Sequence, residues 1–564
     1  MITSFALIII FLLFFFIFGF LIDALLKFLI PSQLTQKSDN PDEFFLFGII
    51  IVCWIVSALS LFIKIGLVAF LLLSGIMLLT LFKYRQKIST LFSTTALNIK
   101  NNKIISILTA IFLLFIISKS AYPIANYDSG LYHIQNIKWI ENFPAIFGLG
   151  NLHNRFAYNS NWFLLSALTG VNYIFGIRFY ILNILFTCVS TIFFVMRISK
   201  FTRKKTLSGL ISLLLFFYST ILTYGYVNSP TQDLPVTLLI WIVIILFIEK
   251  YEQSQLHTWD KKSVLILLLC CLAMTIKLSS FPLLMIPAFL FLDSAKKNHH
   301  WEWKSLIIGV IFLLPWICRN IMISGCIIYP VAFLQIPWFD WSIPKDTVRE
   351  MAEIIRAWAI LPKMDRDIVL AMPYPEWIIK WSFNRTVEDL VLSIITILGM
   401  FLFILQDTYK YIRTKRSGNH DAYFFIFLDV SIFSGALFWF LSAPDPRFGY
   451  GYLVAGFIVF ISRIFYSILT HNILYKAIAL VSICLLSISI VKSFASPNIT
   501  ENFVLPPQVA TANTEIQITD DNFSYSIPTD GDQCWDAPLP CAPKTISGLH
   551  LRENDFSDGF RIKQ

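Results

Sequence analysis

Charged residues are scarce in this sequence, and that scarcity decides the class of protein. Only 14% of the 564 residues are charged, whereas 57% are hydrophobic. A soluble protein of this length carries roughly a quarter charged residues. Apolar runs of about 17–22 residues, the length that crosses a bilayer, recur along the chain. The composition therefore excludes a soluble globular domain and indicates an all-α polytopic membrane protein.

Three further observations exclude or weaken particular classes of protein. The first apolar run, "FALIIIFLLFFFIFGFLI", has no basic n-region and no small-residue cleavage site, so we expect a retained span rather than a cleaved leader. No internal repeat is evident, which weakens the case for an inverted-repeat transporter. The net charge of +9 indicates no nucleic-acid partner, because the basic residues lie between the apolar runs.

Hydropathy predicts about fourteen transmembrane helices. They lie at 3–22, 44–63, 65–82, 104–118, 177–196, 206–225, 234–249, 263–279, 281–293, 305–324, 389–406, 423–441, 450–467 and 475–491. Basic residues gather in the links at 83–103, 197–205, 296–304 and 410–416. These links all fall on one side, which the positive-inside rule makes cytoplasmic. Both termini are then external.

This topology divides the chain into five parts. They are N-terminal transmembrane helices at 1–103, a core at 104–335 with the first large external loop at 119–176, an external loop at 336–387, C-terminal transmembrane helices at 388–492 and an external tail at 493–564. The tail is too short for a large core, so we expect a small cap over the outer face.

The tail contains two cysteines in "GDQCWDAPLPC". Cys534 and Cys541 have two prolines between them, and we expect a local disulfide in an oxidising compartment, with two unpaired thiols as the alternative. Two cysteines alone make a poor metal site, so zinc is not expected.

The first external loop carries the most polar stretch outside the tail, which includes "NYDSGLYHIQNIKWIEN". Apolar residues recur at helical spacing from Leu131 to Ile140, which predicts an amphipathic helix on the membrane surface with Trp139 at headgroup depth. Asp128 lies where the N-cap of this helix belongs. Two interpretations therefore stay open, a cap for free backbone N–H groups and a functional carboxylate.

Four more charged residues lie near the outer ends of spans. Asp233 in "SPTQDLP" is either a helix cap or functional, and Lys277 in "MTIKLSSFP" either snorkels to the interface or has a function. Arg319 lies inside an apolar run, where a charge costs roughly 2.5–3.5 kcal/mol and should face a polar partner or cavity. Arg447 in "PDPRFGYG" has a local pair with Asp445 as its alternative.

Cations and carboxylates at one membrane face suit one kind of chemistry. Arginine binds phosphate oxygens bidentately, so these cations suit a lipid-linked phosphate or pyrophosphate. A nearby carboxylate could act as general base on a hydroxyl that attacks an anomeric carbon. The cations would then stabilise the departing phosphate.

At these residues the chain resembles the GT-C superfamily of multi-spanning glycosyltransferases, such as the protein O-mannosyltransferases and the lipid A aminoarabinose transferase. The likeness lies in "NYDSGLYH", "SPTQDLP" and "LPWICRNIMISGCIIYP", over residues 100–335, with a weaker echo at "PDPRFGYG". The whole pattern, tail included, is similar to an uncharacterised family of bacterial polytopic membrane proteins. It departs from the O-mannosyltransferases in having one acid in the loop instead of an Asp-Glu pair. It also has several spans before the loop, where the superfamily commonly has one.

The resemblance implies a GT-C-like core and roles for individual residues. Asp128 would be catalytic, and Lys277, Arg319 and Arg447 would bind the donor phosphate. The supporting residues would be Tyr127, His133, His153, Arg155, Asp233 and Asn320. The partners would be a polyprenyl-phosphate-linked sugar, a glycan or lipid acceptor and the lipid bilayer. No cofactor is certain, and a divalent metal stays open. The location implied is the bacterial inner membrane, with the active face periplasmic.

Three other functions are alternatives to glycosyl transfer. A polysaccharide polymerase or ligase also needs outer-face cations but takes oligosaccharide pyrophosphates. A lipid or glycan transporter would carry charges near mid-membrane on several spans, whereas Arg319 is nearly alone there. A purely structural subunit would leave Arg319 and the acids of the outer loops unexplained.

Overall fold

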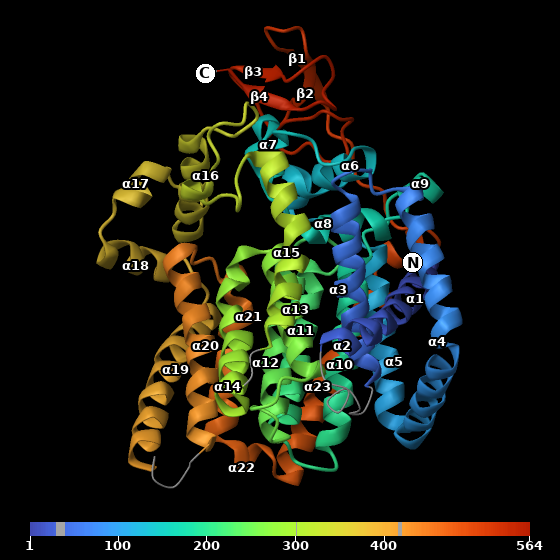
Figure 1. The fold of residues 1–564 in the computed structure, drawn as a ribbon, viewed down its shortest axis with the longest axis vertical. Helices are drawn as coiled ribbons and strands as arrows, with labels where there is room; N and C mark the ends of the chain where they lie inside the picture. The colour runs from blue at the N-terminus through green and yellow to red at the C-terminus, as the bar shows by residue number, and fades with distance from the viewer. Residues whose placement is uncertain (30–39, 300–301, 415–419, 564) are drawn as a thin grey trace.

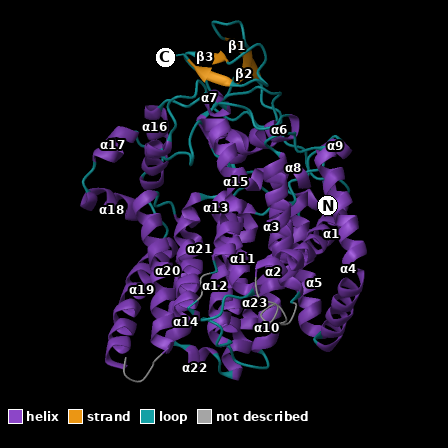
Figure 2. Ribbon diagram, viewed as in Figure 1, coloured by secondary structure: helices purple, strands orange, loops and turns teal. Residues whose placement is uncertain are grey.

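The computed structural model describes residues 1–29, 40–299, 302–414 and 420–563. Within them the chain is mostly helical, with a small β region near the C-terminus (Figure 2). The long helices stand side by side, and the β strands lie at one end of the molecule (Figure 1). We call that end the cap end.

Among the described residues, ten helices are long and apolar enough to cross a membrane by length and composition. The chain is therefore a multi-pass membrane protein, as its hydropathy predicts. All fourteen predicted spans fall on helices, but 105–121 and 207–222 form shorter apolar helices. The helix at 261–276 has only 16 residues.

The N-terminal part consists of two tightly crossed helices and their neighbours. A Cβ on Gly48 would lie 1.7 Å from the carbonyl oxygen of Phe15, so only glycine permits this approach of α3 to α1. The elements here are α1 (Ile2–Phe18), η1 (Gly19–Leu21), α2 (Ile22–Leu29), α3 (Pro41–Leu59), α4 (Leu67–Asn101), α5 (Lys103–Ser118) and η3 (Lys119–Ala121).

The central part is built around α12, whose residues from Leu234 to Lys250 are all buried. A helix that is apolar on every side belongs inside a bundle. In contrast, α4 leaves Leu79 and Phe82 more than 70% exposed, as a lipid-facing helix would. The central elements are α10 (Leu182–Phe201), α11 (Leu207–Tyr226), α12 (Asp233–Glu252), α13 (Lys261–Ile276), η6 (Leu278–Leu284), α14 (Met285–Asn298) and α15 (Trp303–Ser324).

A run of shorter helices at the cap end precedes the last long ones (Figure 1). The elements are η7 (Ala332–Leu334), α16 (Lys345–Ile360), α17 (Arg366–Ala371), α18 (Tyr374–Phe383), α19 (Val387–Thr414), α20 (His420–Ser442), α21 (Pro446–Ile464), α22 (Tyr466–Leu469), α23 (Asn472–Phe494) and α24 (Pro497–Glu501). The link between α10 and α11, which is one of the predicted basic links, lies at the opposite end from the β strands (Figure 1).

The tail forms two small antiparallel sheets. β1 (Thr514–Ile518) pairs with β2 (Ser524–Pro528), with Thr514 opposite Pro528. β3 (Leu549–Leu551) pairs with β4 (Phe560–Ile562), with Leu549 opposite Ile562. Cys534 and Cys541 form a disulfide between the two sheets, with an S–S distance of 2.07 Å. The tail therefore folds into a small cap on the end of the bundle.

The first external loop lies beneath this cap. Its elements are the π-helical turn η4 (Ser129–His133), α6 (Ile134–Asn142), α7 (Leu149–Leu152), η5 (Asn154–Ala157), α8 (Asn161–Thr169) and α9 (Asn172–Phe175). The prediction of an amphipathic surface helix at 131–140 is wrong in one respect. Trp139 is 2% exposed and packs on Phe556 and Phe560 of the tail, so it faces protein rather than lipid headgroups.

A buried ion-pair network, which we did not predict, joins four helices near their ends away from the cap. Arg197 of α10 contacts Asp42 of α3 at 2.5 Å and Glu249 of α12 at 3.1 Å. Lys262 of α13 contacts the same Glu249 at 3.0 Å. Buried charges are tolerated when they are paired in this way. The network therefore fixes how α3, α10, α12 and α13 meet.

Candidate functional site

Asp128 lies between two arginines at the cap end. One carboxylate oxygen is 3.2 Å from Nη1 of Arg155 in η5, and the other is 3.3 Å from Nη1 of Arg447 in α21. Asp128 precedes η4 but makes no side-chain cap hydrogen bond there. The carboxylate is thus committed to the arginines, and the interpretation of Asp128 as a helix cap is wrong.

A second ion pair stands beside the first. Lys277, which follows α13, contacts the carboxylate of Asp233 at the start of α12. Asp233 makes no cap hydrogen bond for α12, whose N-cap is Gln232. Both Lys277 and Arg447 lie on the ring of Phe448, at 3.6 and 4.8 Å from its centroid. Lys277 and Arg447 therefore lie close together, on the same aromatic ring.

Arg447 is also held by its own helix end and by α16. Its Nε lies 3.6 Å from Asp445, and Asp445 caps α21 by accepting the backbone N–H of Arg447 at 3.1 Å. The guanidinium lies 4.9 Å from the ring of Trp358. The predicted local pair with Asp445 therefore exists together with the contact to Asp128. Phe448 and Trp358 are site residues that the sequence interpretation missed, and so is the capping of α21 by Asp445, although "PDPRF" contained the signal of a capped helix.

Electrostatics at Asp128 favour the ionised form. Burial alone would raise the pKa of its carboxyl, but His133, Arg447, Arg155 and Lys277 act in the opposite direction, and the pKa lies below its usual value. Burial lowers the pKa of His133 to about 4, so its imidazole is neutral at pH 7. The lasting positive charge beside Asp128 is therefore that of the arginines and the lysine.

A shallow hollow, whose cavity volume of about 10 Å³ holds little more than a water molecule, lies beside this cluster. Asp233 and Arg447 supply its charged wall. The other lining residues belong to α11, α12 and α21, and they are Leu222, Tyr226, Leu234, Thr237 and Tyr450. One side of the hollow is therefore apolar and aromatic and lies among the long helices. The other side is formed by the charged side chains of Asp233 and Arg447.

The remaining supporting residues have different surroundings. Tyr127 is 57% exposed, and its hydroxyl donates to Asp532 of the tail. His133 is buried beside Asp128, and its Nδ1 lies 3.2 Å from the hydroxyl of Ser129. His153 packs on Phe156, and within the described chain its Nε2 has no hydrogen-bond partner.

Arg319 makes none of the contacts of the Asp128 cluster. It is 5% exposed in α15, and its Nη1 lies 3.3 Å from the hydroxyl and 3.4 Å from the carbonyl oxygen of Ser60, just after α3. No carboxylate pairs with it in the parts of the chain that the structure covers. Asn320 is also buried, and its Nδ2 has no partner among the described residues. The structure thus brings together Asp128, Lys277 and Arg447 but leaves Arg319 and Asn320 outside.

Proline accounts for how α15 meets α3. Pro315 has no backbone N–H, so the carbonyl group four residues earlier loses its helical partner. The indole nitrogen of Trp54 in α3 donates to that carbonyl, of Ile311, at 3.0 Å. The bond joins the two helices about two turns before Arg319. No group of three metal-ligating side chains occurs in the described ranges.

Comparisons with known proteins give one match. No curated protein matches the chain, and no solved structure matches it. Residues 1–454 match a family described as a domain of unknown function (DUF8201), and the match includes Asp128, Arg155, Asp233, Lys277 and Arg447 but ends before the tail. With most of its length in this match, the chain belongs to the DUF8201 family.

Proposed function

We propose that the protein is a GT-C-like glycosyltransferase of the bacterial inner membrane, with about fourteen spans and its cap end in the periplasm. It would transfer a sugar from a polyprenyl-phosphate-linked donor to a glycan or lipid acceptor in cell-surface biosynthesis. The observation that supports this most is the carboxylate of Asp128 held between Arg155 and Arg447, beside a hollow with an apolar side among the helices.

Arg447 and Lys277 are the proposed contacts for the donor phosphate. Both lie on the ring of Phe448, and Arg447 also lines the hollow, so a phosphate bound beside Arg447 would have Lys277 as a second cation nearby. The polyprenyl chain would run along Leu222, Leu234 and Tyr450 toward the lipid. Arg319 binds Ser60 instead of this cluster, so the proposal no longer assigns it to the same phosphate.

The chemistry proposed is a single displacement at the anomeric carbon. Asp128 accepts the proton of the acceptor hydroxyl as its oxygen forms a bond to that carbon. The bond from the anomeric carbon to the phosphate oxygen breaks, and polyprenyl phosphate leaves with the electron pair. Arg447 and Lys277 stabilise the charge that develops on it. Asp128 then releases its proton to water.

Donor binding itself would prepare Asp128 for this role. A carboxylate whose pKa is below its usual value is a weak base, because a good base has a pKa near the working pH. A bound phosphate would engage Arg447 and add negative charge nearby. Both effects raise the pKa of Asp128 in the complex.

Binding of the leaving product tests this assignment. Purified protein in nanodiscs is titrated with polyprenyl phosphate, and Arg447→Gln and Lys277→Gln should each weaken binding roughly tenfold, about 1.4 kcal/mol. The control is Lys380→Gln, because Lys380 forms only an exposed ion pair with Glu376. Unchanged affinity in both site variants would refute the phosphate site. Turnover only with an oligosaccharide pyrophosphate would favour a polymerase or ligase instead.

A further inference from the structure

The disulfide loop of the tail, residues 530–541, contacts the chain on both sides of Asp128. The side chain of Gln533 donates to the carbonyl oxygen of Tyr127 at 2.8 Å, and the hydroxyl of Tyr127 donates to Asp532. Two residues after Asp128, the carbonyl oxygen of Gly130 accepts the backbone N–H of Trp535 at 2.9 Å. The loop therefore forms part of the surroundings of the candidate base, although it is 400 residues away in sequence.

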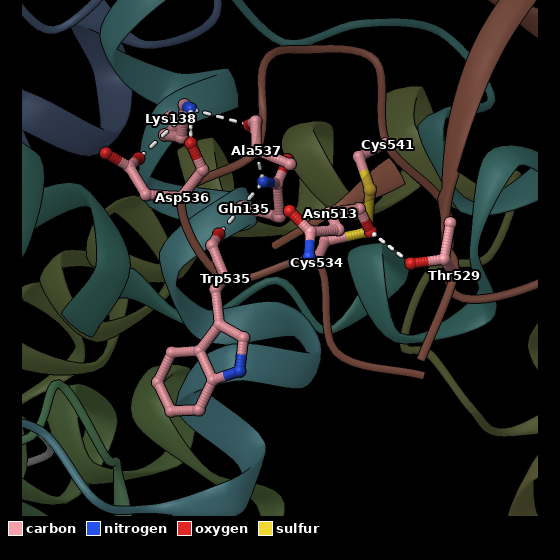
Figure 3. Close-up of a disulfide and its surroundings, with 9 residues drawn as sticks. All are labelled: Gln135, Lys138, Asn513, Thr529, Cys534, Trp535, Asp536, Ala537 and Cys541. Carbon is pink, nitrogen blue, oxygen red and sulfur yellow. Dashed lines mark hydrogen bonds and ion pairs between the residues drawn. A yellow bond between two sulfur atoms is a disulfide. The ribbon is translucent and has the colours of Figure 1, made fainter. Parts of the chain in front are cut away.

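Polar side chains of α6 hold this loop in place (Figure 3). The amide of Gln135 donates to the carbonyl oxygens of Trp535 and Ala537 at 3.0 and 2.9 Å. Lys138 donates to the carbonyl oxygens of Asp536 and Ala537 at 3.0 and 2.7 Å. These bonds satisfy the side chains of Gln135 and Lys138, and they give the loop a fixed position.

Trp535 is the residue of the loop whose conformation is strained. Its φ is +44°, in the left-handed region that a bulky side chain rarely adopts. Strain of this kind persists only where the surroundings impose it, and it occurs often at functional sites. The partly exposed indole points away from the disulfide, so it does not serve to bury that bond (Figure 3).

Gly130 in "NYDSGLYH" leaves the space that the indole of Trp535 occupies. A Cβ at this position would lie 2.5 Å from Cε2 of Trp535, so any larger residue would push the ring away. The glycine thus lets the ring lie on the backbone two residues from Asp128. The hollow proposed for the lipid donor is lined by Arg447, which contacts one carboxylate oxygen of Asp128.

We propose that the indole of Trp535 is the platform for a sugar ring of the acceptor, which makes the acceptor a glycan rather than a lipid. Resting on the proposed function, this inference gives Asp128 a donor side formed by Arg447 and an acceptor side formed by Trp535. An aromatic face with a polar N–H suits a sugar ring, which is apolar on its faces and polar at its edges. The family match ends at residue 454, so Trp535 lies outside the matched part of the chain.

Acceptor kinetics of Trp535 variants test this inference. With a polyprenyl-phosphate-linked sugar and glycan fragments of the cell envelope as acceptors, Trp535→Ala should raise the acceptor KM roughly tenfold or more, about 1.4 kcal/mol per tenfold. Affinity for polyprenyl phosphate should not change. Trp535→Phe should keep most of the acceptor affinity, and Gly130→Ala should resemble Trp535→Ala. Trp338→Ala is the control, because Trp338 is 78% exposed and belongs to another external loop.

The possible outcomes separate this inference from the proposed function. If the wild-type protein transfers no sugar from a polyprenyl-phosphate-linked donor to any acceptor, the proposed function fails and this inference with it. If the wild-type protein transfers sugar but Trp535→Ala leaves the acceptor KM unchanged, only the platform fails. Transfer to a lipid acceptor alone, with no glycan used, would also overturn it.

Discussion

At the scale of single residues, Asp128 shows what a sequence can and cannot say. Its position before a helical turn is typical of a cap and equally of a functional acid. Only the side-chain contacts decide, because the cap bond is missing and Arg155 and Arg447 take both oxygens. Composition and spacing do not reveal that these two arginines contact Asp128. Arg447, for example, lies 319 residues later in the chain.

The pH dependence of turnover follows from the charges around Asp128. A general base is active when ionised, so activity should fall as pH drops through its pKa. In the free enzyme that pKa is below the usual value for aspartate. In the donor complex it should be higher, because bound phosphate offsets the arginines. The acid limb of kcat should therefore lie at higher pH than that of kcat/KM.

Steady-state kinetics from about pH 3.5 to 8 measure both limbs, since kcat/KM reports the free enzyme and kcat the complex. The same acid limb for both quantities would show that donor binding does not change Asp128. Arg155→Lys, which keeps the charge beside Asp128, should preserve the order of the two limbs.

At the scale of elements, hydropathy located the helices but not the surroundings of α6. Each predicted span lies on a helix, because bilayer-length apolar runs need no partner to be recognised. The spacing from Leu131 to Ile140 did predict a helix. Its environment depended on the tail, whose Phe556 and Phe560 cover Trp139. Long-range packing of that kind leaves no periodic signal in either segment.

The buried ion pairs of the long helices were missed for a similar reason. Arg197 ends an apolar run and looks like one more cytoplasmic positive charge. In the structure it is 3% exposed and joins Asp42 and Glu249. Sequence gives the sign of such a charge, whereas its burial depends on how three helices meet.

Removal of Arg197 should destabilise the protein strongly. Arg197→Gln leaves Asp42 buried without its arginine and leaves Glu249 paired with Lys262, and the loss expected is about 3–5 kcal/mol. Thermal unfolding in detergent measures it as a lower midpoint. Arg349→Gln is the control, because Arg349 pairs with Asp346 on the exposed surface, where a pair contributes about 0–1 kcal/mol. Equal midpoints for the two variants would contradict a structural role for the network.

At the scale of the whole molecule, the chain has two different ends. The basic link between α10 and α11 lies at one end, and the disulfide-bonded tail lies at the other (Figure 1). The tail contacts Tyr127, the residue before Asp128. Met1 is held by Asn502 and Val504, so the N-terminus lies against the start of the tail. That the cap end faces an oxidising compartment stays a prediction of the charge pattern.

The central claim is that this end of the molecule transfers a sugar with Asp128 as base. The most direct measurement compares wild-type protein and Asp128→Asn in nanodiscs, using a polyprenyl-phosphate-linked sugar and scoring both donor binding and sugar transfer. Asp340→Asn, which alters an exposed ion pair with Arg552, is the control. The account predicts that Asp128→Asn folds and binds donor but loses transfer by about 10²–10⁴-fold. Full transfer activity in Asp128→Asn would contradict it.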